Sequence, residues 1–243
     1  MLSIRTIEEK AFRAWPALET RQAHGWVQRF AGGYTKRANS INALAPDFKF
    51  TLDVKDALEV PYIERGLAPV WRLTPLAPPD TDRVLAAAGY RLIDQSFIQV
   101  APIDGQFVAD PEVRIEAAPS PAWLAGFAEQ SPVAPAHRKA MTQMLQAIAA
   151  PVAFLSVDDD DGPMAFALGV ADGEHVGVFD VLVAPRARRR GLARRLTTSI
   201  GAWGKTQGAL FAYLQVVSTN AAALPLYASL GFETVYSYAY RVP

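Results

Sequence analysis

The feature that most limits the possible folds of this chain is an internal repeat. The segments LAAAGYRLIDQSFIQV (85–100) and YASLGFETVYSYAYRV (227–242) align without a gap at an offset of 142 residues. In both, a helix-like run ends at a glycine, Gly89 or Gly231, and an aromatic residue and an alternating strand pattern follow. Glycine favours the left-handed conformation that ends many helices. The repeat predicts two related domains in tandem, although helix–glycine–strand corners also occur in unrelated segments.

The predicted boundary between the domains lies in the segment APIDGQFVADPEV (101–113), where prolines and a glycine interrupt the pattern. We therefore expect one domain at 1–105 and a second at 112–243. The second domain mixes strand and helix patterns, which indicates an α/β fold with a mixed α+β sheet. Its expected strands are VRIEAA (113–118), PVAFLSV (151–157), PMAFALGV (163–170), HVGVFDVLVAP (175–185), ALFAYLQVV (209–217) and 232–242, and its expected helices lie within 121–130, 137–149, 192–203 and 221–230.

The first half of the chain has a less regular pattern. Its first residues predict an amphipathic helix with Ile4, Ile7, Ala11 and Trp15 on one face. The segment GYTKRANSINAL (33–44) carries glycine and asparagine at turn positions. A strand at 68–75 and a helix at 80–90 complete the expected elements.

Composition excludes several classes of function. Apolar residues make up 51% of the chain, which is enough to build a core and argues against global disorder. Lysine plus arginine and aspartate plus glutamate number 24 each, so the net charge is zero and a dedicated nucleic-acid binder is disfavoured. Cysteine is absent, which excludes disulfides and cysteine nucleophiles. Without a signal-peptide pattern or a long apolar span, we expect a cytoplasmic protein that does not bind membranes.

An arginine-rich segment interrupts this neutral background. In APRARRRGLARR (184–195), six arginines fall within ten positions and Gly191 lies among them. A strand pattern precedes the segment, and the spacing of Leu192, Leu196 and Ile200 predicts a helix after it. The first amides of a helix lack internal partners and lie at the positive end of its dipole, so this place favours an anion. A nucleic-acid patch and a solvated helix face are the alternatives.

The context of the segment favours one family. The pattern Arg188-x-x-Gly191-x-Ala193 resembles the Q/R-x-x-G-x-G/A signature of GNAT-type N-acetyltransferases, which binds the pyrophosphate of acetyl-CoA. The later segment resembles the family pattern N-x-x-A-x-x-L-Y-x-x-x-G-F at Asn220, Ala223, Leu226, Tyr227, Gly231 and Phe232. The resemblance covers roughly 112–243 and extends to bacterial members with tandem domains. In the first half Leu85 stands where the second has Tyr227, and the signature is missing, so that half is expected to be a degenerate domain of the same fold.

The resemblance implies direct transfer of an acetyl group from acetyl-CoA, a cosubstrate, to a primary amine, without a metal. Tyr227 is then the general acid that protonates the departing thiolate. The family's fourth and fifth strands separate, and the pantetheine arm of the cosubstrate lies in the gap. The residues that the resemblance assigns to acetyl-CoA are Leu182, Val183, Arg188, Arg189, Arg190, Gly191, Leu192, Ala193, Arg194 and Asn220.

Several assignments have two interpretations. Asp180 lies in an apolar strand, where it is either the general base or half of a structural ion pair. Tyr238 and Tyr240 line an acceptor site or pack in the core. The segment YTKRANS (34–40) meets a polar substrate or is a surface loop.

Three hypotheses about the whole protein follow. The first is an N-acetyltransferase, monomeric or homodimeric, for a small-molecule or peptide amine. The second is an inactive acyl-CoA sensor of the same fold. The third, a nucleic-acid binder built on the arginines, is disfavoured by the neutral net charge.

Overall fold

The computed structural model describes residues 3–131, 133–160 and 162–243. The first half contains α1 (Ile4–Ala14), β1 (Glu19–Ala23), β2 (Trp26–Phe30), η1 (Lys36–Ala38), β3 (Ile41–Ala43), α2 (Leu52–Ile63), β4 (Trp71–Leu73), α3 (Thr81–Ala87) and β5 (Arg91–Pro102). The second half contains β6 (Arg114–Glu116), α4 (Pro121–Gln130), η2 (Pro135–His137), α5 (Arg138–Gln146), β7 (Val152–Asp159), β8 (Gly162–Asp172), β9 (His175–Val183), η3 (Pro185–Ala187), α6 (Leu192–Thr206), β10 (Phe211–Val217), α7 (Ala223–Ala228) and β11 (Glu233–Val242).

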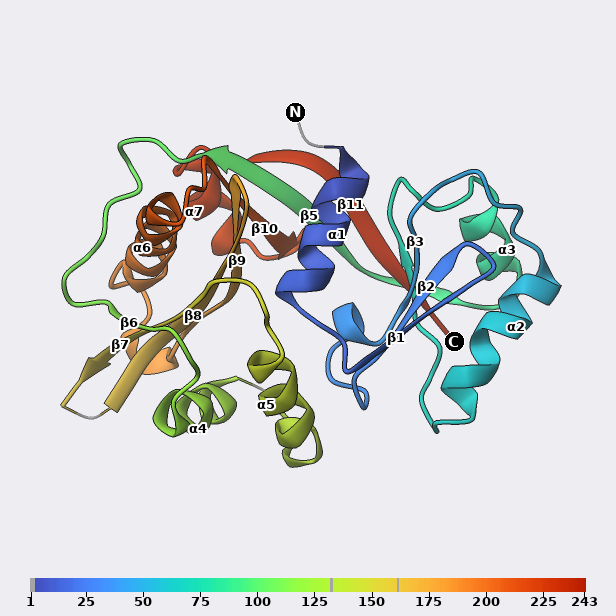
Figure 1. Ribbon diagram of the computed structural model, residues 1–243, viewed down its shortest axis with the longest axis horizontal. Coiled ribbons are helices and arrows are strands. Elements are labelled where there is room, and N and C mark those ends of the chain that lie inside the picture. The colour runs from blue at the N-terminus through green and yellow to red at the C-terminus, as the bar shows by residue number, and fades with distance from the viewer. Residues whose placement is uncertain (1–2, 132, 161) are drawn as a thin grey trace.

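All the described strands join one mixed sheet in the order β1-β2-β3-β4-β11-β5-β10-β9-β8-β7-β6. The two halves of the chain occupy the two ends of this sheet, and the long strands β5 and β11 cross between them (Figure 1). This arrangement confirms the predicted α/β class with a mixed sheet.

The pairing pattern repeats between the halves. Strands β1 to β4 run antiparallel, antiparallel and then parallel, and β7 to β10 follow the same sequence of pairings. The predicted offset of 142 residues also holds in space, since it relates the start of α3 at Thr81 to that of α7 at Ala223. It likewise relates the start of β5 at Arg91 to that of β11 at Glu233. The repeat in the sequence is thus a repeat of structure.

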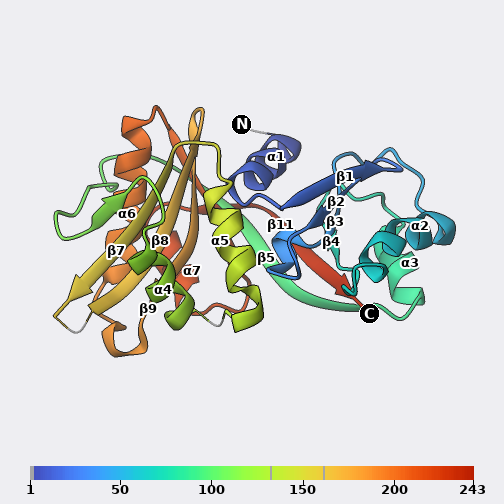
Figure 2. The same ribbon diagram turned by 60° about the horizontal axis from the view of Figure 1, so that its bottom comes forward.

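The two halves exchange their last strands. Strand β5 belongs to the first half by sequence, yet it lies between β10 and β11 of the second. Strand β11 in turn pairs with β4 of the first half. Both long strands can be followed across the molecule in Figure 2. The predicted division at 105 and 112 follows the order of the chain, whereas the sheet is continuous across it, and these bounds stay a prediction.

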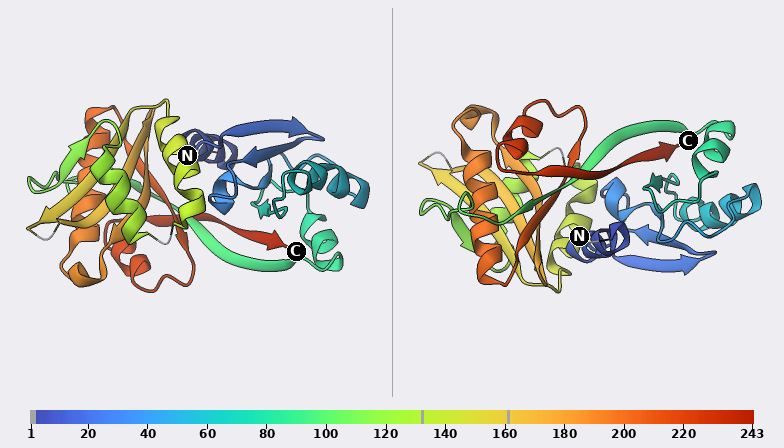
Figure 3. Two further views of the ribbon diagram at one scale, coloured as in Figure 1. Left: turned by 90° about the horizontal axis from the view of Figure 1, so that it is seen from below. Right: turned by 90° about the horizontal axis from the view of Figure 1, so that it is seen from above.

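Helices cover both faces of the sheet in the second half. Helices α4 and α5 lie on one face and α6 on the other (Figure 3). Alternation along the strands explains this, because neighbouring residues point to opposite faces. Phe154 of β7 packs with Trp123 of α4, whereas the next residue, Leu155, belongs to the apolar cluster of Leu196 and Ile200 on α6. The predicted apolar stripe of α6 is therefore confirmed.

Helix α1 joins the two halves. Its Lys10 ammonium donates to the carbonyl of Asp172 at 2.6 Å, at the end of β8. Its predicted apolar face is confirmed by the burial of Ile7 and Ala11. No helix in the described part of the chain has both the length and the apolar character needed to cross a bilayer.

Candidate functional site

The parallel strands β9 and β10 pair over only part of their length. Their register runs from Phe211 opposite His175 to Leu214 opposite Val178, and there it stops. Beyond this point β9 carries a bulge against β8 between Phe179 and Leu182, and Asp180 within it has a φ of 50°. A bulge bends a strand and increases its twist. The two strands therefore separate at the centre of the sheet, as the family resemblance implies.

A cavity of about 350 Å³ lies where β9 and β10 separate. We call it the central cavity. The second half contributes β9, the end of β10, β11, and α7 with the loop before it, and the first half contributes η1 and β5. Its polar lining residues are Thr35, Lys36, Arg37, Asp94, Ser96, Asp180, Gln215, Asn220, Tyr227, Tyr238 and Tyr240.

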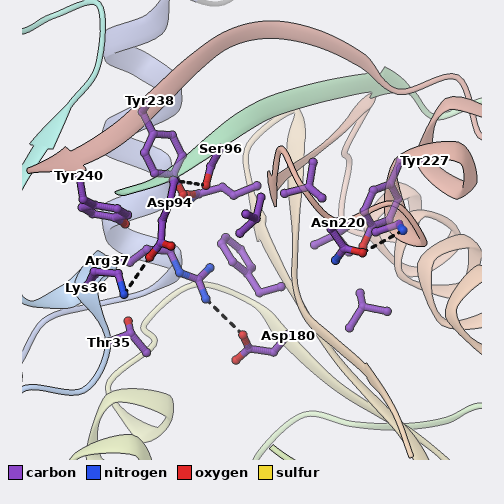
Figure 4. Close-up of a pocket in the computed structure, with 17 residues that line it drawn as sticks. Thr35, Lys36, Arg37, Asp94, Ser96, Asp180, Asn220, Tyr227, Tyr238 and Tyr240 are labelled. Carbon is purple, nitrogen blue, oxygen red and sulfur yellow. Dashed lines mark hydrogen bonds and ion pairs between the residues drawn. The ribbon is translucent and has the colours of Figure 1, made fainter. Parts of the chain in front are cut away.

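Tyr227 enters this cavity from the last turn of α7, on one side of the view in Figure 4. Its ring packs edge-on against Phe232, with centroids 5.7 Å apart, and only 8% of the residue is exposed. Burial raises the pKa of Tyr227 to about 12. At neutral pH the hydroxyl therefore keeps its proton and can donate it.

Asn220 orders the start of α7. The Ala223 amide donates to Asn220 Oδ1 at 3.1 Å, which satisfies one of the amides that lack a partner inside the helix. The same asparagine lines the central cavity beside Tyr227. Asn220 thus caps the start of α7, and its contact with a ligand stays a prediction.

Asp180 pairs with a residue of the other half. The Arg37 Nη2 donates to Asp180 Oδ1 at 3.3 Å, and both side chains are largely buried (Figure 4). Burial raises the pKa of Asp180, and the charge of Arg37 opposes part of this rise. Asp180 Oδ2 is buried and has no hydrogen-bond partner among the described residues. The ion-pair interpretation is therefore correct, and the role of base is compatible with it.

The segment 34–40 supplies the opposite wall of the cavity. Thr35, Lys36 and Arg37 all line it, and the Lys36 ammonium pairs with Asp94 of β5 at 2.9 Å. Arg37 also lies over the ring of Trp15, 4.9 Å from its centroid. The substrate-facing interpretation of this segment thus has a geometric basis. Sequence reasoning missed Asp94, which shares with Asp180 a positive φ at a strand bulge.

Tyr238 and Tyr240 of β11 are both buried and both line the cavity. They therefore pack in the core and also lie where an acceptor could bind. The Tyr238 hydroxyl donates to Gln215 Oε1 at 2.9 Å, and its ring meets that of Tyr240 edge-on. His137 lies near the Tyr34 ring and His175 stacks on Phe211, and neither lines the cavity.

The predicted anion site begins where β9 ends. Gly191 precedes the first turn of α6 with a φ of 78°, a conformation that favours glycine, and a Cβ there would meet no protein atom within 4 Å. Because glycine has no side chain, no side-chain cap among the described residues satisfies the first amides of α6. Leu192 is buried under the helix, whereas Ala193 is half-buried. The helix start therefore has room for an anion, and the binding of one there stays a prediction.

The arginines around Gly191 divide into two groups. Arg195 is held by Asp110 at 2.6 Å and by Glu112 at 2.5 Å, and Arg186 by Asp159 at 2.6 Å. The other four are exposed. Two of these have weak anchors, since Arg190 lies 3.3 Å from Met164 Sδ and Arg194 donates to Ser229 Oγ. The exposed group, with donors available to a ligand, comprises Arg188, Arg189, Arg190 and Arg194.

The predicted residues fall in two neighbouring places. Tyr227, Asn220 and Asp180 all line the central cavity. Leu182 and Val183 follow Asp180 on β9, past the point where β10 stops pairing, and lead to Gly191. The free edge of β9 and the uncapped helix start suit an extended ligand that ends in phosphates.

Comparisons with known proteins point to acetyltransferases. A family model described as "Probable histone acetyltransferase Rv0428c C-terminal" matches residues 2–241. The "Uncharacterized N-acetyltransferase YobR" of Bacillus subtilis is 27% identical over 250 residues, which cover 100% of this chain and 99% of that protein. The ribosomal protein bS18-alanine N-acetyltransferase of Salmonella typhimurium is 37% identical over 79 residues, which cover 32% of this chain and 53% of that protein.

Solved structures share the fold at low sequence identity. A GCN5-related N-acetyltransferase from Kribbella flavida superposes with a TM-score of 0.70 at 16% identity, and the match covers 100% of this chain and 96% of that chain. A tandem GNAT protein from the clavulanic acid biosynthesis pathway gives a TM-score of 0.65 at 10% identity, covering 98% of this chain and 87% of its own. The tandem arrangement thus extends over the whole molecule.

Proposed function

Because the chain belongs to the GNAT superfamily of acetyl-CoA-dependent N-acetyltransferases, we propose that its second half binds acetyl-CoA and that a primary amine enters the central cavity from the side of the first half. The acetyl group passes directly to the amine, with Tyr227 as the general acid. The observation that carries the proposal is that Tyr227 and Asp180 meet in one cavity beside the separated strands.

The residues along β9 and α6 fit acetyl-CoA, which supplies an activated thioester. Backbone groups of Leu182 and Val183 lie on a strand edge without a β10 partner and can pair with an extended arm. The uncapped amides after Gly191 suit a pyrophosphate. Arg188, Arg189, Arg190 and Arg194 add charged donors around it.

The corresponding helix start in the first half is capped. Helix α2, which takes the place of α6 in the repeat, begins after Thr51, whose hydroxyl accepts the Val54 amide at 3.3 Å. This cap satisfies an amide that Gly191 leaves open in the second half. Leu85 replaces the tyrosine and is fully buried. The first half therefore serves the acceptor side of the site rather than a second cosubstrate.

Two groups in the cavity are suited to opposite proton transfers. Tyr227 carries its proton at neutral pH and gives it to the thiolate as the C–S bond breaks. Asp180 is a carboxylate beside Arg37 and accepts the proton that the amine loses as the N–C bond forms, directly or through water. Each such transfer typically contributes about 10²–10⁴-fold to the rate.

Replacement of Tyr227 by phenylalanine tests the proposal. We expect Tyr227→Phe to lower kcat by about 10²–10⁴-fold while calorimetry still detects acetyl-CoA binding, because only the hydroxyl is lost. Tyr213→Phe is the matched control, since this buried hydroxyl has no partner among the described residues and Tyr213 does not line the cavity. If the native protein binds acetyl-CoA but acetylates no amine, the sensor hypothesis replaces this one.

A further inference from the structure

A second, much smaller cavity adjoins the central one. It has a volume of about 10 Å³ and is surrounded by three arginines, Arg29 of β2, Arg37 of η1 and Arg72 of β4. We call it the arginine niche; its other lining residues are Ala11, Phe12, Trp15 and Gln215. Arg37 and Gln215 line both the niche and the central cavity. The niche is therefore a neighbour of the space assigned to the acceptor.

Arg72 has unused hydrogen-bond donors in this niche. The residue is only 3% exposed, and its Nη1 pairs with Glu8, whose other oxygen accepts from Tyr236 at 2.6 Å. Its Nε and Nη2 are buried without a partner among the described residues. The Tyr238 ring covers the guanidinium, 3.8 Å from the centroid. Leaving such charged donors unpaired is costly, so they favour an acceptor atom.

The charges around the niche do not balance. Arg72 has Glu8 as its partner and Arg37 has Asp180. Arg29 is buried as well, but the described residues give it only the backbone carbonyls of Phe12, Trp15 and Arg37. Burial, reinforced by the charge of Arg72, lowers the pKa of Arg29 to about 9. Three buried cations therefore face two carboxylates, and one negative charge would complete the set.

We propose that the arginine niche is an anion subsite that binds a carboxylate of the acceptor, so that the acceptor is an amine that also carries a carboxylate, as an amino acid does. The inference rests on the proposed function, because it assumes that the amine enters the central cavity. The size of the niche supports it, since a cavity of this volume holds about one water-sized atom group. One carboxylate oxygen fills it and accepts from Arg72 while the other faces Arg37.

The first test compares acceptors that differ only in this group. β-Alanine carries the carboxylate, whereas propylamine and β-alaninamide present an amine on the same carbon chain without the charge. We expect kcat/KM to be about tenfold or more higher for β-alanine, or for a longer ω-amino acid, than for its neutral partners. Equal values for charged and neutral acceptors, with activity intact, overturn the carboxylate subsite and leave the proposed function standing.

Two variants and one control locate the effect in the niche. Ala11→Val fills the niche without changing a charge, and Ala14→Val adds the same volume to a buried position of the same helix that does not line it. Arg72→Lys keeps a cation beside Glu8 but removes the unpartnered guanidinium donors. We expect Ala11→Val and Arg72→Lys to abolish the preference for β-alanine, with propylamine turnover retained, and Ala14→Val to keep it. The same loss in Ala14→Val overturns the assignment.

Calorimetry without acetyl-CoA separates the two proposals. We expect β-alanine to bind the native protein and not Ala11→Val, and propylamine to bind both weakly. Acetate binding to the niche, combined with no preference among acceptors, makes it a site for a free anion and overturns the acceptor proposal. If no amine is acetylated at all, the proposed function fails. The carboxylate subsite is then supported by β-alanine binding that Ala11→Val removes, and overturned by its absence.

Discussion

At the scale of single residues, the pair of Asp180 and Arg37 determines how the site responds to pH. Burial raises the pKa of Asp180, and Arg37 opposes this. Removal of the guanidinium removes the opposing effect, so the pKa rises further. A base must be ionised to accept a proton, so if Asp180 is the base, we expect kcat to rise with pH through the pKa of Asp180.

We expect Arg37→Gln to move the acid limb of the kcat–pH profile to higher pH. The profile is measured at saturating amine, with one amine for all variants, so that the ionisation of the acceptor is common to all. Lys36→Gln is the control, because Lys36 pairs with Asp94 instead. A limb that stays in place or moves to lower pH in Arg37→Gln contradicts the assignment of Asp180 as the base.

Sequence alone predicted one side of the site better than the other. Asn220 lies just before α7, and Tyr227 lies seven residues later within this helix. One local sequence pattern therefore contains both. Arg37 reaches Asp180 over a separation of 143 residues, and no local pattern encodes that contact. The arginine niche is still harder to predict from sequence, because Arg29, Arg37 and Arg72 come from three separate elements.

At the scale of elements, the two ends of α6 provide a matched pair of glycines. Gly191 precedes the helix with a φ of 78° and Gly208 follows it with a φ of 91°, and a Cβ at either meets no atom within 4 Å. Any other residue is strained at both positions by about 1 kcal/mol. A substitution at either glycine therefore lowers the free energy of unfolding by a similar amount, and the two positions differ only in their surroundings.

We expect Gly191→Glu to abolish acetyl-CoA binding in calorimetry, because its carboxylate would face the phosphates at the helix start. Gly208→Glu should bind normally, while urea unfolding shows a similar loss of stability in both. Normal binding by Gly191→Glu would show that the phosphates lie elsewhere.

Elements with regular patterns were predictable, and irregular ones were not. The apolar spacing of α6 and the alternation of β11 indicated both correctly. The strand β2 was missed because it buries Gln28 and Arg29 along with its apolar residues, which removes any alternation. Helix α2 was missed because it contains Pro61 and exposes Leu52 and Ile63. Contacts that exist only in the folded protein stabilise such residues. The Gln28 side chain, for example, donates to the Leu58 carbonyl.

At the scale of the whole molecule, the exchange of strands makes each half depend on the other. Every residue of β10 from Phe211 to Val217 pairs with β5. A fragment of residues 112–243 lacks β5 and leaves open edges on β10 and β11, which favour aggregation. We expect this fragment to be insoluble alone and to become soluble when co-expressed with residues 1–105, as judged by gel filtration. A well-folded monomeric fragment would contradict the role of β5.

The repeat also leads to a prediction about the number of bound cosubstrates. Because Thr51 caps α2 and Leu85 replaces the tyrosine, we expect calorimetry to give one acetyl-CoA per chain. Gly191→Glu should then remove all binding. Two molecules per chain would show that the first half has kept a binding site of its own.

The exchanged strands also restrict how such a chain can evolve. Strand β5 is encoded in the first half but completes the sheet of the second, and β11 does the reverse. A genetic event that deletes, duplicates or transfers one half alone therefore yields a unit with a missing strand. The two halves are inherited as a pair, and a substitution in one is selected through the activity of the other. A first half without a cosubstrate site of its own would still be retained, because β5 completes the sheet of its neighbour.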